Sequence, residues 1–263
     1  MPFDTNGFLG KEALKMSEQI TAKHKRLFEF CHETNRFAQK TIRDFKISIQ
    51  NRQEVFAACF LIKIIEGAQA AILLTERGLG SEGAIILRTV SETLAFLILC
   101  VETEDFPEAY MRYSEVERIK KLKNILKNKF HETVTTLGAE ADIKRQLSEL
   151  EKKFCKEEIN NLKKYFSKRN IYEKAGHLSI YESFYSVTSD YAHANAESLT
   201  KYVAFNDKAG ISQFSYGPSD ENTRHNLVAA AEFTLSALSC ACKLFKMDKN
   251  KEIKDYHGEL KKL

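Results

Sequence analysis

The chain has 263 residues, an ordinary length for one compact domain, and 43% of them are hydrophobic, which is enough for one main core. It contains only three Pro and 11 Gly, and its long segments are rich in Leu, Ala, Glu and Lys, so strand-and-turn architectures are poorly supported. The composition therefore predicts an all-α fold, with residues 1–263 forming a single antiparallel helical bundle.

The cysteines and the first residues of the chain predict a compartment. Six cysteines lie mostly inside apolar helical pattern without metal-ligand spacing, as buried thiols do in a reducing environment. The N-terminal residues lack a basic region followed by an apolar stretch, so no signal peptide is expected. These features predict a cytoplasmic protein.

In chain order, apolar residues at helical spacing predict a first helix over residues 11–50 and a second over 52–76. Gly78 suits the position just after the second helix, and Ser81 suits the N-cap of a third helix that covers residues 83–101. Because the connection is short, the second and third helices should be antiparallel neighbours.

Two of these segments reach the length of a membrane span, residues 55–74 and 83–101. Lys63 and Glu66 interrupt the first segment, and two more charges interrupt the second. A charge at the centre of a membrane helix costs about 2.5–3.5 kcal/mol on insertion scales. We therefore expect central helices of a soluble bundle and no contact with a membrane.

The two charges of the third helix are Arg88 and Glu92, one helical turn apart in an apolar run. If the second and third helices form a hairpin, Glu66 lies level with Glu92, and Gln69 lies level with Arg88. A guanidinium in a low-dielectric core needs such polar partners. The sequence therefore predicts a buried polar layer between these helices.

The segment of residues 115–174 differs from the rest in charge, because it holds 16 Lys or Arg against 10 Asp or Glu, a net charge of +6. Two apolar stripes at helical spacing predict that it forms a protruding helical hairpin within the domain. Its lysines indicate either a solvated helix pair or a surface for nucleic acid or an acidic partner.

The remaining segments are a predicted aromatic helix over residues 177–202 and an irregular stretch over 205–218, with a short hairpin around 208–210. Ser219 and the acids after it predict the start of the last helix. The lysine-rich tail from Lys249 onward is expected to be frayed.

Familiar catalytic signatures are absent from the sequence. There is no P-loop, dinucleotide glycine fingerprint, HExxH motif, nucleophile elbow or pair of CxxC motifs. A di-metal bundle needs two Glu-x-x-His pairs, and Glu29 with His32 supplies one. Arg26 and His32 have the spacing of the helical RNases of the HEPN superfamily, but Leu27 is not polar and chance readily produces such a match. We expect neither a cofactor nor a metal.

A stronger constellation pairs Arg88 and Glu92 with Ser189 and His193, each pair at i, i+4 and so on one helical face. The two segments resemble a bacterial family known only as domain of unknown function fifty-six seventy-seven. Its first motif has the form R-S-x-x-E, which Arg88 and Glu92 match. Its second has the form S-x-Y-x-H, which Ser189, Tyr191 and His193 match.

The resemblance covers roughly residues 52–245 and includes departures from the family pattern. Thr89 replaces the usual Ser, and Phe96 replaces a polar residue after the glutamate. The resemblance implies an all-α bundle with no established activity, and it implies ties to phage-defence or toxin-like systems.

Two functions remain open. In the first, the cluster binds a phosphate-bearing ligand or cleaves RNA, with an Arg stabilising the anion, a Glu holding a His that acts as general base or acid, and a Ser as donor or nucleophile. The residues of that catalytic set are Arg88, Glu92, His193 and Ser189, and those expected to line the ligand are Glu66, Gln69 and Tyr191.

The alternative is a non-enzymatic helical interaction or scaffold protein, in which the same cluster is a structural polar layer that fixes helix register. Such a protein would form a homodimer through an apolar helix face and use the basic hairpin as a partner surface.

Overall fold

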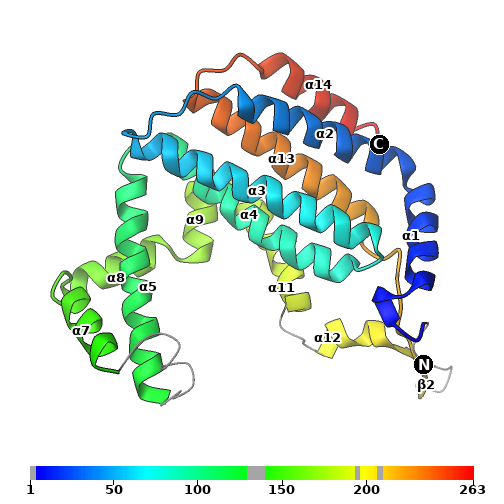
Figure 1. Ribbon diagram of the computed structural model, residues 1–263, viewed down its shortest axis with the longest axis horizontal. Helices are drawn as coiled ribbons and strands as arrows, with labels where there is room; N and C mark the ends of the chain where they lie inside the picture. Colours follow the sequence, from blue (N-terminus) through cyan, green and yellow to red (C-terminus); the bar gives the residue numbers. More distant parts are fainter. Residues whose placement is uncertain (1–3, 129–139, 193–195, 206–209) are drawn as a thin grey trace.

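The computed structural model describes residues 4–128, 140–192, 196–205 and 210–263. Figure 1 shows an arch of helices with one arm descending at each end, and the described residues contain one two-stranded sheet. The all-α prediction is confirmed. The arch itself is a bundle whose long helices share one continuous hydrophobic core.

The predicted first helix is in fact two. After a short 3-10 turn, η1 (Gly7–Leu9), the chain forms α1 (Lys11–Lys23) and α2 (Lys25–Arg43), and it bends at His24, where the backbone leaves the helical region. The His24 ring lies 2.6 Å from a carboxylate oxygen of Asp220, far away in the sequence. That contact at the bend is long-range, so local periodicity could not reveal it.

The next two helices form the predicted antiparallel hairpin, α3 (Arg52–Glu76) and α4 (Gly80–Glu102). Gly78 in the turn has a φ of +75°, and a Cβ added there would lie 2.6 Å from Pro218, so this position requires glycine. Ser81 is not the N-cap, because α4 begins one residue before it.

A third long helix, α13 (Thr223–Leu244), packs against both helices of that hairpin and against α2. The buried Asn226 amide donates hydrogen bonds to the Thr75 hydroxyl at 3.0 Å and to the Gly80 carbonyl at 2.8 Å. One side chain thereby joins the end of α3, the start of α4 and the first turn of α13.

The C-terminal segment differs from its prediction. The last long helix begins at Thr223 rather than at Ser219, and the lysine-rich tail is not frayed. It forms α14 (Asn250–Leu260), whose Tyr256 ring stacks on Phe37 of α2 with centroids 5.0 Å apart. An apolar face hidden among many lysines is what holds this helix on the bundle.

One arm of the arch carries most of the predicted basic hairpin. It consists of α5, α7, α8 and α9, and it descends from the start of α3 and the end of α4 (Figure 1). Part of it has a small hydrophobic core of its own. The helices span Phe106–Asn128, Glu140–Glu151, Lys156–Tyr165 and Lys168–Lys174, and that core is formed by Ile119, Leu122, Ile143 and Leu150.

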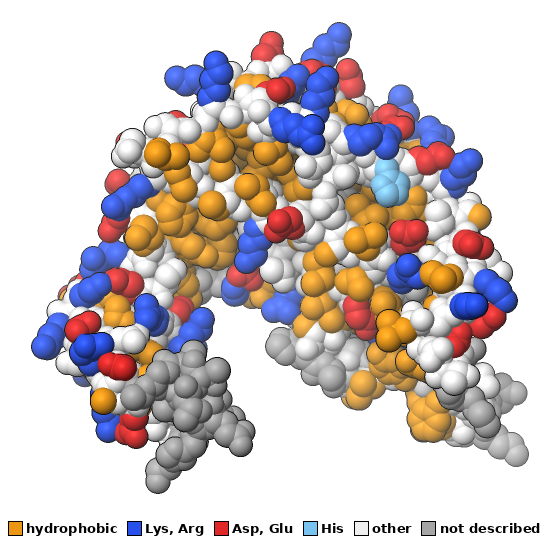
Figure 2. Space-filling view, viewed as in Figure 1, with side chains coloured by type: hydrophobic (Ala, Val, Ile, Leu, Met, Phe, Trp, Pro, Cys, Tyr) orange, Lys and Arg blue, Asp and Glu red, His pale blue; other side chains and the backbone are white. Residues whose placement is uncertain are grey.

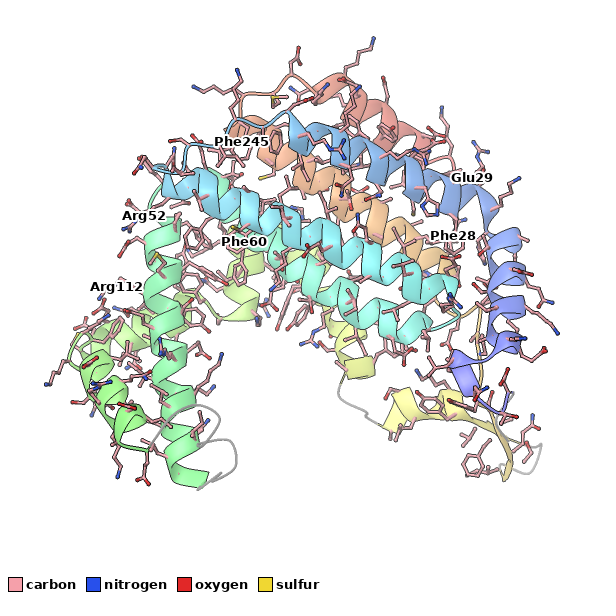
Figure 3. All side chains as sticks on the ribbon, in the orientation of Figure 1. Phe28, Glu29, Arg52, Phe60, Arg112 and Phe245 are labelled. Carbon is pink, nitrogen blue, oxygen red and sulfur yellow. The ribbon has the colours of Figure 1, made fainter. Side chains whose placement is uncertain are left out.

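Aromatic rings join this arm to the bundle. Phe60 projects from α3 toward α5 (Figure 3), and its ring centroid lies 5.4 Å from that of Tyr110. Phe166, between α8 and α9, stacks on Tyr113 of α5 with centroids 4.5 Å apart. The base of the arm is therefore packed on the bundle.

The other arm replaces the predicted helix over 177–202, which is wrong as a single helix. Thr188 and Ser189 donate their hydroxyls to the carbonyls of Phe184 and Tyr185, and such back-bonding perturbs regular helix. The segment is divided into α10 (Leu178–Ile180), the π-helix η2 (Tyr181–Tyr185), α11 (Ser186–Ala192), α12 (Ala196–Leu199) and the 3-10 helix η3 (Thr200–Tyr202).

Two short antiparallel strands follow, β1 (Val203–Phe205) and β2 (Ile211–Phe214), with Val203 opposite Phe214. The predicted hairpin near 208–210 is confirmed in its strands, and most of its turn lies outside the described residues.

The exclusion of a membrane span, and with it the assignment to the cytoplasm, is wrong. By length and composition α3, α4 and α13 could each cross a membrane, and their most apolar stretches hold no more than two charged residues each. The sequence argument treated those charges as prohibitive and did not consider α13. A bundle core and a membrane select the same apolar side chains, so composition alone does not separate them.

Candidate functional site

Arg88 lies half-buried on α4 and faces the π-helix η2. Its Nη2 donates to the Tyr185 hydroxyl at 3.1 Å, and the guanidinium carbon lies 4.7 Å from the centroid of the same ring. Its Nε is buried and has no hydrogen-bond partner among the described residues. One donor of this cation is therefore unused by the described part of the protein.

Glu92 lies one turn further along α4 and pairs with Lys168 of α9. Its side chain is 21% exposed. Burial raises the pKa of Tyr110 and of Tyr172, and the negative charge of Glu92 adds to both shifts. The carboxylate thus lies among tyrosines with a lysine as its counter-ion, and no described contact joins it to Arg88.

Sequence reasoning missed two residues that organise this site. The Ser91 hydroxyl donates to the Arg88 carbonyl at 2.8 Å and lies 2.7 Å from the Tyr172 hydroxyl, which is fully buried. Since the Ser91 proton is already used, Tyr172 is the donor of the second bond. A small polar residue one turn after Arg88 and directly before Glu92 was the available signal for Ser91.

Three tyrosine rings form a cluster over α4. Tyr172 of α9 and Tyr181 and Tyr185 of the π-helix have ring centroids 5.3 to 5.5 Å apart. A π-helical turn inserts an extra residue into the helical repeat and often occurs at functional sites. Here it places Tyr181 and Tyr185 on the same side, and Tyr185 contacts Arg88.

The second predicted motif is only partly described. Ser189 donates its hydroxyl to the Tyr185 carbonyl at 2.8 Å, so that proton is engaged within its own helix. The Tyr191 hydroxyl accepts a hydrogen bond from the Asn222 amide at 3.3 Å. His193 lies outside the described residues, and its predicted bond to Glu92 stays a prediction.

The predicted polar layer between α3 and α4 does not include the two residues expected from α3. Glu66 is exposed, and the Gln69 amide donates to the Asn35 side chain of α2 at 2.8 Å. The neighbouring Gly67 faces α4 instead, since a Cβ there would lie 2.5 Å from Val90. The antiparallel pairing of α3 and α4 was predicted correctly. The face that α3 turns toward α4 was not, because the helix is rotated about its axis relative to the prediction.

An open cavity of about 350 Å³ lies beside the second motif. Its walls include Tyr191, Asp190 and Lys201. A second cavity of about 320 Å³ shares Lys201 with it and reaches the start of α4. Of the predicted ligand-lining residues, Tyr191 is the one that borders this cavity.

The described residues contain no group of three or more His, Cys, Asp or Glu side chains that could hold a metal ion. All six cysteines are free thiols.

Comparison with known proteins places the chain in a family. Residues 54–211 match the model of a family of unknown function, DUF5677. The chain belongs to this family. No curated protein and no solved structure matches it. The region that matches DUF5677 contains both motifs, so the resemblance is confirmed, and a family of unknown function assigns the protein no reaction.

Proposed function

We propose that this DUF5677 protein binds a phosphate-bearing ligand through Arg88. The observation that carries the proposal is the buried Nε of Arg88, which has no partner among the described residues while Nη2 is held by Tyr185. A guanidinium presents its donors in a planar fork that suits phosphate oxygens.

The charges near Arg88 support an anionic ligand. Lys168 is a second cation near this face of α4, where it pairs with Glu92. These three side chains carry a net charge of +1. The Ser91–Tyr172 bond ties α9 to α4 and so keeps Lys168 in place.

RNA cleavage is the finer form of this proposal. His193, two residues after Tyr191, would be the general base toward a 2′-hydroxyl, and Arg88 would stabilise the phosphate. Ser189 is a poor nucleophile here, because its hydroxyl donates to a backbone carbonyl. Glu92 is already paired with Lys168, so another group would have to orient His193.

The test is titration of the purified full chain with pyrophosphate and with a short single-stranded RNA. Arg88→Gln should weaken binding about tenfold to a hundredfold, as expected for the loss of a charged hydrogen bond. Arg77→Gln, at an exposed arginine, is the matched control and should bind like the wild type. Equal affinity of the wild type and Arg88→Gln for both probes would overturn the proposal.

A second experiment addresses the finer claim. The wild type and His193→Ala are compared for cleavage of the same RNA and for host growth on expression. Cleavage that depends on His193 supports an RNase. Binding without cleavage by either protein would support a ligand-binding protein and would contradict the RNase proposal.

The alternative is a helical interaction protein in which this cluster is a structural layer. It is favoured by the internal partners of Ser91, Glu92 and Ser189. If Arg88→Gln lowers the melting temperature and neither probe binds the wild type, this alternative replaces the first proposal.

A further inference from the structure

The arm formed by residues 175–222, called the hairpin arm below, exposes several large apolar side chains. On β2, Ile211 is 59% exposed and Phe214 is 70% exposed. Figure 2 shows hydrophobic side chains gathered at the lower right of the molecule, where this arm lies. Apolar surface concentrated in this way marks interaction sites. The other members are Val187, Leu199, Tyr202 and Tyr216.

The backbone of the hairpin arm is also incompletely paired. β1 and β2 form a two-stranded sheet with no third strand in the described residues. An isolated hairpin is marginally stable in water, and its free edges are open to pairing. Contact with a partner would therefore stabilise the tip of this arm.

The two arms of the arch carry opposite charges. The hairpin arm holds six acidic residues against two lysines, a net charge of −4, while residues 115–174, called the basic arm below, carry +6. Asp190 and Glu221 on the hairpin arm form no ion pair with any described residue. The same is true of Lys163 and Lys164 on α8.

The basic arm also offers an apolar groove of about 410 Å³ between α5 and α8. Ala109, Leu162 and Tyr165 form its floor, and Glu158 at its wall is held by Arg112. A cavity of about 150 Å³ holds a benzene ring, so the groove has room for a phenylalanine side chain.

We propose that copies of this chain associate head to tail, with the hairpin arm of one copy seated on the basic arm of the next and Phe214 in the α5–α8 groove. The two arms touch at their bases, where Arg169 pairs with Glu182, but β2 and the α5–α8 groove lie at opposite ends of the arch (Figure 1), so the hairpin arm does not fill the groove of its own chain. The charges of −4 and +6 attract in this arrangement and repel when like arms meet.

A head-to-tail contact is heterologous, so each assembly keeps one free arm at either end and extends beyond a dimer unless it closes into a ring. The attraction between the arms is screened by salt. The oligomers should therefore grow with protein concentration and shrink as the salt concentration rises.

The experiment is sedimentation velocity of the full chain over a range of concentrations. Phe214→Ser removes the apolar side chain that the hairpin arm inserts into the groove. Lys163→Glu with Lys164→Glu reverses two charges of the basic arm. Each variant should raise the dissociation constant at least about tenfold, as truncation of a central interface residue does. Leu73→Ser, at a 61% exposed leucine of α3, is the control and should associate like the wild type.

A mixture of the two variants tests whether unlike arms pair. The Phe214→Ser copy keeps its basic arm and the charge-reversed copy keeps its hairpin arm, so together they should form a dimer and nothing larger. Unchanged self-association of the charge-reversed variant would show that like hairpins pair instead, and the proposal would fail.

Two further results would overturn the proposal. One is a wild type that stays monomeric at every concentration. The other is flotation of the wild type with neutral phosphatidylcholine vesicles that Phe214→Ser abolishes, without self-association of either protein, because the apolar tip would then serve a lipid surface.

Discussion

Two clusters of buried polar groups lie between the helices of this protein. Their hydrogen-bonding groups are paired to different degrees. At the α3–α4 turn, Asn226 donates to both Thr75 and the Gly80 carbonyl. Further along α4, Arg88 donates to Tyr185 while its buried Nε has no described partner. In the first cluster both N–H groups of the amide are used within the protein, whereas in the second a buried donor has no described partner.

This difference separates a structural from a functional interpretation of buried polar residues. An amide whose two N–H groups are both used between three helices fixes their register and has no donor left for a ligand. A cation with a free donor carries a cost that a bound anion would remove. Substitutions in the two clusters and at nearby contacts distinguish these two interpretations.

Asn226→Ala should lower the free energy of unfolding by about 3 kcal/mol, because two buried groups lose their donor. Arg88→Gln should lower it by less than about 1 kcal/mol, because the described structure uses one of its nitrogens as a hydrogen-bond donor. Denaturant unfolding followed by circular dichroism measures both. A larger loss for Arg88→Gln than for Asn226→Ala would reverse the comparison.

Gly80→Ala should cost about 2 kcal/mol, since the new Cβ would lie 2.1 Å from the Glu221 carbonyl oxygen. Gly258→Ala in α14 is the matched control, because a Cβ there has no atom within 4 Å, and alanine should stabilise that helix by about 0.5 kcal/mol. Thermal melts of both variants would show opposite shifts. Tolerance of Gly80→Ala would mean that the α3–α4 turn is not tightly packed.

Tyr172→Phe should lower the free energy of unfolding by about 1 kcal/mol, because Ser91 loses the hydrogen bond that ties α9 to α4. If α9 positions Lys168 for a ligand, the same variant should also weaken pyrophosphate binding. Calorimetric titration and a melt separate the two effects. Tyr165→Phe, at a ring that packs on Phe166, keeps its ring contact and loses no described hydrogen bond, so it serves as the control.

The smallest effect concerns Asp220, which contacts Lys23 and His24 at the corner of α1 and α2. Burial alone would raise the pKa of this carboxyl, but hydrogen bonds and charge interactions with Lys23 and His24 together outweigh burial and lower the pKa below its ordinary value. A depressed folded pKa contributes stability above the unfolded value, and that stability is lost as the pH falls through the folded pKa.

Asp220→Asn should therefore lower stability at pH 7 by less than about 1 kcal/mol, because the pair is partly exposed, and by a smaller amount at pH 2. Unfolding curves at the two pH values measure the difference. An equal loss at both would attribute the effect to packing rather than to charge.

Much of the bundle could be predicted from the sequence, because its signals are local. The apolar period and the Gly78 turn predict α3, α4 and their antiparallel packing. The bend at His24 could not be predicted, because the partner of that ring is Asp220 from a distant segment. The order of α14 depends likewise on rings of α2.

The candidate site shows the same division. Arg88 and Glu92 stand out as charges in an apolar helix, and periodicity places them one turn apart. Their partners, Tyr185 and Lys168, come from segments whose irregular backbone has no clear sequence pattern. The prediction that Glu66 and Gln69 join the polar layer was wrong, because α3 is rotated so that Gly67 faces α4.

The helical bundle and the charges inside an apolar helix follow from composition and period, which are properties of each segment alone, and membership of DUF5677 follows from the two sequence motifs. Only the tertiary structure decided which groups meet those charges and which polar groups are satisfied. Such pairings depend on helix rotation and on contacts between distant segments, and no single segment encodes them.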